Sequence, residues 1–295
     1  MNHKEEIFML WIGDNLPELQ WLSLKSLLLT GHKVKFYTYE NYPETLSLVQ
    51  EFNNLEILDA NTIIPKDKIW RYTVSDFGKG SVSGFANHWR LVYLEKFGGT
   101  WVDFDILAIR NLNEMYQDKE ILIGSELTGK GKRARQRPNN NLLSFPIGDP
   151  LIKRMLEISE DVGSNAEHAQ TGPKLLNKLL RSKDWSTYSK FVLTYMSVGS
   201  ITYDRSRSFV KDSPETVCKE QDIDINEVYG FHVWNTYFTV NTKTDVLNNS
   251  LEDDSIYAVM RDIIKSSRNK DEYIDKVKLA FPEYQRVLTQ KANLF

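Results

Sequence analysis

The first forty residues carry the pattern that most constrains the fold of this chain. Residues 7–12 form a short apolar run that ends in Gly-Asp-Asn, which is typical of a strand and its turn. Leucines at helical spacing over residues 19–28 predict a helix that ends at Gly31. Residues 34–39 alternate apolar side chains with lysine and threonine and predict a second strand. A strand, a helix and a strand in this order indicate an α/β fold with a mostly parallel sheet.

The rest of the chain extends this architecture. Apolar runs predict further strands at residues 55–58, 100–107, 121–125, 142–145 and 229–234. Helical patterns cover residues 85–97, 150–159 and the chain from 255 onward, and Gly98 and Gly99 end the first of them. The stretch GKGKRARQRPNNN, from Gly129, has no apolar anchor and predicts an exposed loop. We expect a single domain over residues 1–240 and a helical C-terminal appendage over residues 241–295.

Composition excludes several classes of protein. The chain of 295 residues has a net charge of −3, so no global basic field attracts it to nucleic acid or to a membrane. The N-terminus is charged where a signal peptide needs an apolar stretch, and no apolar run is long enough for a transmembrane helix. The single cysteine, Cys218, excludes an internal disulfide and fits a reducing compartment. We therefore expect a cytoplasmic protein, with peripheral contact at the inner membrane face left open.

Two aspartates lie in the predicted strand at residues 100–107. Because side chains alternate along a strand, Asp103 and Asp105 are expected on one face. Two neighbouring carboxylates repel one another unless a cation joins them, and oxygen ligands of this kind suit Mn²⁺ or Mg²⁺. The spacing alone is a weak signal, because Asp222 and Asp224 repeat it in polar surroundings that indicate a solvated loop.

Two other chemistries of this spacing are excluded by the residues that follow. An EF-hand loop needs an oxygen-bearing side chain and then a glycine where this chain has Leu107 and Ala108. An aspartyl phosphatase of the DxDxT type needs a threonine where Leu107 stands.

The stretch GFANHWRLVYLEKFGGTWVDFDI resembles the sugar-binding region of GT-A fold glycosyltransferases with a DxD motif. That group includes bacterial polysaccharide transferases, fungal initiating mannosyltransferases and glucosylating toxins. The positions that match its pattern are Ala86, Asn87, Arg90, Gly98, Gly99, Trp101, Asp103 and Asp105. Leu91 replaces the usual tyrosine, and Asn87 stands where many members have aspartate. The blocks FMLWIGDNLP, TGPKLL and YGFHVWN resemble further segments of the same family.

This resemblance implies a Rossmann-like GT-A catalytic domain and a set of roles for its site residues. Asp105 would bind the metal directly, and Asp103 would contact the donor ribose and sugar as well as the metal. His232 would bind the diphosphate or the metal. Arg90 would hold sugar hydroxyls or phosphate, and we count Arg90, Asp103 and Asp105 as catalytic.

Other residues would bind the donor. Trp11 would stack on uracil, Gly13 would let the turn approach the nucleotide, and Asn87 would contact the sugar. The remaining donor contacts expected from the resemblance are Asn141, Thr171, His232 and Asn235. Several have ordinary structural explanations as well: Trp11 or His232 as core residues, Asn87 as a helix cap, and Arg90 in a surface salt bridge.

Five cations, Lys130, Lys132, Arg133, Arg135 and Arg137, form a basic loop. A solvated loop is the plain interpretation, and a lid over an anionic acceptor or over the donor diphosphate is the alternative. A nucleic-acid acceptor has local support from these cations, but the sequence contains no known reader module and no net basic charge.

The resemblance implies a metal-dependent retaining hexosyltransferase that moves a hexose from a UDP-sugar to an acceptor hydroxyl, in bacterial-type surface polysaccharide or glycan synthesis. Retention by double displacement needs a carboxylate nucleophile, which the sequence does not identify, and a front-face route needs only positioning and electrostatics. The alternatives are transfer to nucleic acid or protein, a glycoside hydrolase, and a non-catalytic sugar-nucleotide-binding protein.

Overall fold

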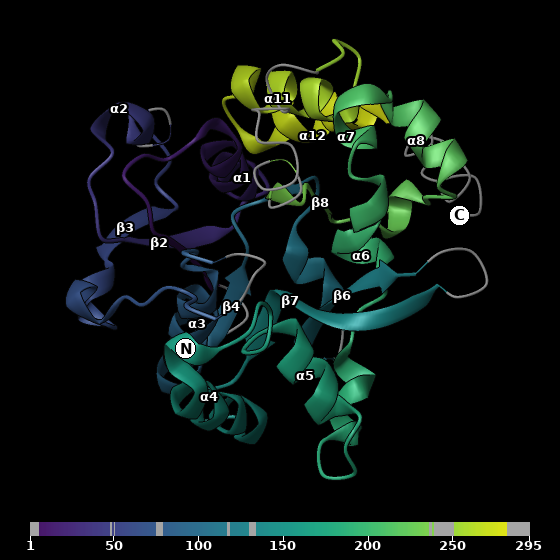
Figure 1. The fold of residues 1–295 in the computed structure, drawn as a ribbon. Coiled ribbons are helices and arrows are strands. Elements are labelled where there is room, and N and C mark those ends of the chain that lie inside the picture. The colour runs from purple at the N-terminus through teal and green to yellow at the C-terminus, as the bar shows by residue number, and fades with distance from the viewer. Residues whose placement is uncertain are drawn as a thin grey trace.

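The computed structural model describes most of the chain and confirms the α/β class. The residues it describes are 6–47, 49, 51–74, 79–116, 119–129, 134–235, 238 and 251–281. A six-stranded sheet has the order β3-β2-β1-β4-β7-β6 (Figure 1). Its strands are β1 Glu6–Trp11, β2 Lys33–Thr38, β3 Leu55–Asp59, β4 Gly99–Val102, β6 Leu122–Thr128 and β7 Arg135–Phe145. The first four pair in parallel and β7 is antiparallel to both neighbours, so the sheet is mixed but mostly parallel.

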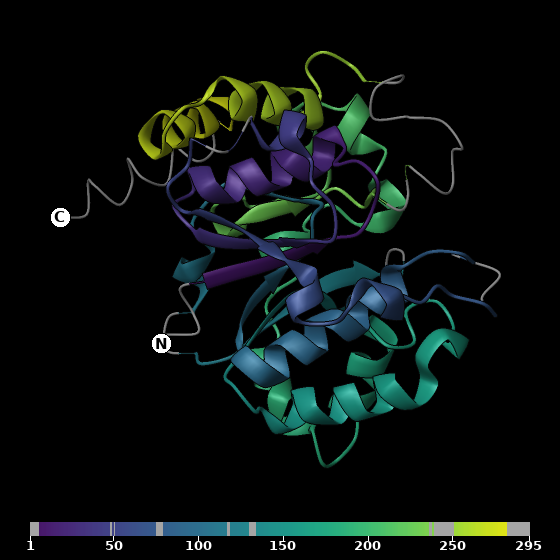
Figure 2. The ribbon, with the colours of Figure 1, turned by 90° about the vertical axis from the view of Figure 1, so that its left-hand side faces the viewer.

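Helices cover both faces of this sheet, as Figure 2 shows. They are α1 Glu18–Leu29, α2 Pro43–Leu46, α3 Ser83–Phe97, α4 Pro150–Val162, α5 Pro173–Leu180, α6 Met196–Gly199, α7 Ser208–Lys211, α8 Pro214–Glu220, α11 Ile256–Ser266 and α12 Lys270–Ala280. The side chains of β1 point alternately to the two faces of the sheet, so they show which helices cover each face. Ile7 and Met9 belong to one core with α1, α11 and α12, whereas Phe8 and Leu10 belong to another with α3, α4 and α5.

Two glycines end α3 as predicted and turn the chain into β4. Gly98 and Gly99 have φ angles of +65° and +110°, which other residues rarely adopt. A Cβ atom on Gly98 would lie 2.8 Å from the backbone nitrogen of Ile147, so the site has no room for a side chain. The turn therefore fixes where β4 starts and where its carboxyl end lies.

The prediction of one strand over residues 100–107 is wrong. β4 ends at Val102, and a separate strand, β5 Ile106–Ala108, pairs antiparallel with β8 Gly230–His232. Between them the chain turns around Phe104, whose ring packs in the core 5.2 Å from that of Phe36. Asp103 and Asp105 are therefore brought together by a turn and not by alternation along one strand.

The prediction of an exposed loop over residues 129–141 is wrong in its second half. Residues 135–141 belong to β7, which forms a hairpin with β6 and shows a register shift near Gly124. Asn139, Asn140 and Asn141 are buried in this strand. Residues 130–133, which include three of the five cations of the basic loop, lie outside the described residues.

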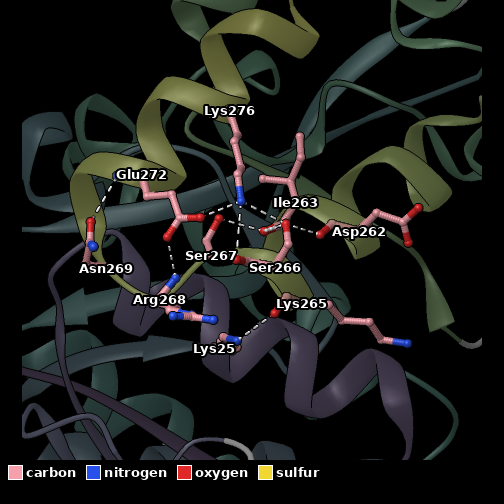
Figure 3. A network of polar contacts seen from close by, with 10 residues as sticks. All are labelled: Lys25, Asp262, Ile263, Lys265, Ser266, Ser267, Arg268, Asn269, Glu272 and Lys276. Atoms are coloured by element: carbon pink, nitrogen blue, oxygen red, sulfur yellow. Dashed lines mark hydrogen bonds and ion pairs between the residues drawn. The ribbon is translucent and has the colours of Figure 1, made fainter.

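The C-terminal helices pack onto the main core. The Tyr273 hydroxyl on α12 donates to the backbone oxygen of Ala108 in β5 at 2.5 Å. Figure 3 shows Lys276 reaching back to the end of α11, where it donates to the backbone oxygen of Ser266 at 3.2 Å and pairs with Glu272 at 2.6 Å. The predicted domain boundary at residue 240 stays a prediction, since residues 239–250 lie outside the described residues.

The structure also bears on whether a helix could span a membrane. Within the described ranges, every helix is too short or too polar to cross a bilayer.

Candidate functional site

A cavity of about 880 Å³ opens at the carboxyl ends of the central strands. Its volume lies in the range typical of small-molecule and cofactor sites, which in parallel sheets form at this edge. Trp11 at the end of β1 and Asp103 just beyond β4 both line it. The sheet topology thus gathers residues from distant parts of the chain around one cavity.

Three candidate metal ligands meet on the wall of this cavity. One ligand atom from each of Asp103, Asp105 and His232 lies within 4.8 Å of the others. Oδ1 of Asp105 is 3.2 Å from Nε2 of His232, and Oδ2 accepts from the backbone N–H of Asn235 at 2.9 Å. The backbone oxygen of Asp105 also accepts from the N–H of Val233 at 2.8 Å. The β5–β8 ribbon therefore fixes the Asp105 carboxylate beside the His232 imidazole.

The Asp103 carboxylate has a different environment. Its Oδ1 accepts from Nε1 of Trp101 at 2.6 Å and forms an ion pair with Arg90 at 3.0 Å. The Arg90 guanidinium also donates to the backbone oxygen of Asn140 and lies 4.2 Å above the Trp101 ring. With a side chain only 6% exposed, Arg90 is a buried cation, and the interpretation as a surface salt bridge is wrong.

These surroundings separate the pKa values of the two carboxyl groups. Burial raises the pKa of Asp103, and the neighbouring Asp105 charge adds to that rise while Arg90 opposes it. Burial also disfavours the Asp105 carboxylate, but His232 and the Asn235 N–H outweigh it and lower the pKa of Asp105. Burial favours neutral His232, yet Asp105 and Asp103 outweigh it and raise its pKa. The cluster therefore attracts positive charge between its members.

The residues present suit a divalent cation of the Mn²⁺ or Mg²⁺ type. Two carboxylates and one imidazole supply oxygen and nitrogen ligands of the kind such ions accept. The Asn141 side-chain amide lies 3.3 Å from Nδ1 of His232, so it can orient the imidazole whose Nε2 faces Asp105.

Asparagines form the floor beside this cluster. Nδ2 of Asn140 donates to Oδ1 of Asn87 at 2.8 Å, and both side chains line the cavity. Asn87 lies mid-helix in α3, so the interpretation as a helix cap is wrong. A Cβ atom on Gly172 would lie 2.7 Å from Nδ2 of Asn87 and 2.8 Å from Nδ2 of Asn140. The segment before α5 therefore closes directly onto this amide pair.

The other residues predicted to bind the donor divide into two groups. Trp11 and Asn235 line the cavity. Gly13, Asn141 and Thr171 are not among the residues that line it. Asn141 and Thr171 are buried, and a Cβ atom on Gly13 would lie 3.1 Å from Nε1 of Trp11. Their roles as ligand contacts stay predictions.

One buried carboxylate in the cavity is not among the residues predicted from the sequence. Glu126 of β6 is 3% exposed, lines the cavity and pairs with Nε of Arg137 of β7 at 2.6 Å. Its charge contributes to the raised pKa of His232. The sequence offers little signal for this residue. A glutamate after an apolar run is typical of the exposed end of a strand, and Glu126 becomes buried only when the hairpin forms.

The second Asp-x-Asp pair lies elsewhere, as expected. Asp222 and Asp224 are exposed, and Asp224 accepts from the backbone N–H of Asn226 in a short turn. It therefore has a local structural role.

Comparisons with known proteins show the fold. No family model matches the sequence, and neither does any curated protein. The apo glycosyltransferase GlyE of Streptococcus pneumoniae TIGR4 is similar in structure, with a TM-score of 0.51 and 12% identity over 95% of this chain. The chain spans 63% of that protein's length. PaToxG glycosyltransferase gives a TM-score of 0.42 at 11% identity, covering 96% of this chain and 87% of its own. The galactosyltransferase LgtC gives a TM-score of 0.42 at 10% identity, and the match covers 78% of this chain and 87% of LgtC.

Proposed function

With the GT-A glycosyltransferase fold as the premise, we propose that this protein is a metal-dependent retaining glycosyltransferase with a UDP-sugar donor. The observation that carries the proposal is the cluster of Asp103, Asp105 and His232, whose ligand atoms lie within 4.8 Å on the wall of a large cavity. An adjacent buried Arg90 supports it, because a guanidinium is suited to sugar hydroxyls and phosphate oxygens.

Asp105, Asp103 and His232 would hold Mn²⁺ or Mg²⁺, which would supply positive charge to stabilise a diphosphate leaving group. Arg90, Asn87 and Asn140 present donors and acceptors to the sugar from the neighbouring wall. Trp11, whose Nε1 donates to the backbone oxygen of Asn15 at 2.7 Å, keeps its ring at the cavity edge for the nucleotide base.

The acceptor would approach from the β6–β7 side, where Glu126 lies. In a front-face reaction the acceptor oxygen bonds to the anomeric carbon on the side from which the diphosphate departs, and its proton passes to a diphosphate oxygen. Glu126 would bind and orient the acceptor hydroxyl in that route, or act as the nucleophile of a double displacement. We favour the first role, because Oε1 of Glu126 is already held by Nε of Arg137 at 2.6 Å, and an oxygen in an ion pair is a poorer nucleophile.

We place the reaction in the cytoplasm, where the single thiol, Cys218, stays reduced, and assign it to surface polysaccharide or glycan synthesis with hexose as the transferred sugar. Peripheral contact with the inner membrane face would bring the enzyme to a lipid-linked acceptor.

A thermal-shift panel tests the proposal. Purified protein is heated with UDP-glucose, UDP-galactose, UDP-N-acetylglucosamine and GDP-mannose, with and without Mn²⁺. We expect at least one UDP-sugar to raise the melting temperature only when Mn²⁺ is present, and Asp105→Ala to abolish that rise. Asp222→Ala is the matched control and should behave as wild type. A panel with no response would refute the proposal.

Two further measurements separate the alternatives. A glycoside hydrolase would keep its activity in EDTA, whereas the proposed enzyme loses it. A non-catalytic binding protein would bind the UDP-sugar without hydrolysing or transferring it.

A further inference from the structure

A second, smaller cavity of about 420 Å³ adjoins the cavity lined by Asp103, Asp105 and His232. The two cavities share Leu127, Gly129 and Asp204 in their walls. Tyr203, which precedes Asp204, packs edge-on against Trp234 at 5.7 Å, and Trp234 in turn contacts the His232 ring at 3.9 Å. The second cavity therefore lies on the acceptor side of the site, next to the β6–β7 hairpin.

Two polar groups in its wall are buried without a partner. Among the described residues, neither Oγ of Ser200 nor Oε1 of Gln221 has a hydrogen-bond partner, and Ser200 is 2% exposed. Buried polar groups are nearly always bonded, so an orphaned pair in one cavity wall indicates a missing hydrogen-bonding ligand. Rotation about χ1 turns a serine hydroxyl into the adjacent space.

The rest of the wall defines the chemistry of that ligand. Tyr195 supplies an aromatic surface, and Thr202 supplies a hydroxyl that donates to Asp204 at 2.7 Å. The described wall carries one acidic and one basic side chain, Asp204 and Arg205, so its charges balance. The aromatic ring, the hydroxyl and amide groups and the balanced charge of the described wall residues suit a neutral, hydroxyl-rich ring better than a phosphate.

We propose that the second cavity is a distal acceptor subsite, which holds the second sugar ring of a neutral oligosaccharide whose terminal ring lies beside Glu126. This rests on the proposed glycosyltransferase function and specifies its acceptor as a glycan of at least two residues. Ser200 and Gln221 would bond the distal ring, and Tyr195 would pack against it.

Stability measurements first test whether the buried Ser200 hydroxyl lacks a hydrogen-bond partner in the free protein. Ser200→Ala removes a buried hydroxyl that has no partner, so the melting temperature should stay equal or rise by about 2–4 °C. The matched control is Ser206→Ala, because Oγ of the equally buried Ser206 donates to the backbone oxygen of Tyr203 at 2.6 Å. That variant should melt lower. A loss of stability in Ser200→Ala equal to that of Ser206→Ala would overturn the proposal.

Binding measurements test the subsite itself. Wild type, Ser200→Ala/Gln221→Leu and Ser206→Ala are applied with UDP and Mn²⁺ to an array of mono- and oligosaccharides. We expect wild type and Ser206→Ala to retain neutral glycans of two or more residues, and the double variant to bind them about tenfold more weakly. Binding of monosaccharides alone, of anionic glycans alone, or of the same glycans by all three proteins would overturn the subsite.

The thermal-shift panel of nucleotide sugars distinguishes failure of the subsite from failure of the proposed function. If a UDP-sugar stabilises the protein in Mn²⁺ and the array shows no neutral oligosaccharide, only the subsite fails. If no nucleotide sugar stabilises it, the proposed function fails first.

Discussion

Arg90 offers the sharpest test of how the site is built. Its guanidinium pairs with Asp103 at 3.0 Å, and the two side chains are 6% and 25% exposed. In Arg90→Met the apolar stem remains, but the Asp103 carboxylate loses its cation while the Asp105 charge beside it stays. The variant therefore leaves an uncompensated, partly buried charge.

The size of the effect follows from that geometry. Removing one partner of a buried ion pair costs about 3–5 kcal/mol, and the partial exposure of Asp103 places this case near 3 kcal/mol. For a chain of 295 residues each kcal/mol lowers the melting temperature by about 2 °C, so we expect a fall of about 6 °C. Arg90→Met/Asp103→Asn removes both charges and should recover most of that loss.

Thermal and urea unfolding of the single and double variants measure this cycle. The control is Arg154→Met, because Arg154 pairs with Glu157 at a similar 2.9 Å but both side chains are 49% exposed. That change should cost less than about 1 kcal/mol. The reasoning on the buried pair is wrong if Arg90→Met loses no more free energy of unfolding than Arg154→Met does. It is also wrong if adding Asp103→Asn to Arg90→Met fails to restore stability.

Three more predictions concern stability and catalysis. Burial lowers the pKa of His32 to about 3 in the folded state, against about 6.5 when unfolded, so the unfolded state alone gains its proton below pH 6.5. The free energy of unfolding should therefore fall by about 2 kcal/mol from pH 7 to 5. Urea titrations at several pH values should show a smaller fall for His32→Gln than for wild type. Glu126→Gln should lower kcat/KM for the acceptor at least about tenfold with donor affinity unchanged, as steady-state kinetics and calorimetry measure; weakened donor binding would contradict its acceptor role. Tyr273→Phe deletes the bond to Ala108 and should cost about 1–2 kcal/mol in urea unfolding; no loss would mean that this bond contributes nothing to docking α12.

Local patterns predicted the parts of the fold that local physics decides. The strand, helix and strand that open the chain, and the glycines that end α3, depend on periodicity and backbone sterics within a few residues. The break between β4 and β5 depends on distant partners. Ile106 leaves the main sheet because β8, more than 100 residues later, offers it an antiparallel edge. Apolar character over residues 100–107 could not distinguish one strand from two.

The site divides in the same way. Asp103, Asp105 and Arg90 were predicted because one short segment carries them all. Glu126 was missed, since its burial arises only when β7 pairs with β6. Residues 142–145 of β7 were predicted as a strand, but residues 135–141 were predicted as a loop because their asparagines give no apolar alternation. The buried Asn140 side chain is stabilised there by its hydrogen bond to Asn87 of α3, and hydropathy does not register that compensation.

The β5–β8 ribbon connects the C-terminal helices to the cluster of Asp103, Asp105 and His232. Ser23 and Ser26 of α1 bond the backbone of Ile106 and Ala108 from one side, at 2.7 and 2.9 Å, and Tyr273 bonds Ala108 from α12. Asp105 directly precedes this anchored strand, and His232 ends the strand paired with it. Metal ligands must be held within a fraction of an ångström, and α1 and α12 give the candidate ligands that rigid support. The helices after residue 255 therefore complete the layer that holds the site, whatever boundary separates them in sequence.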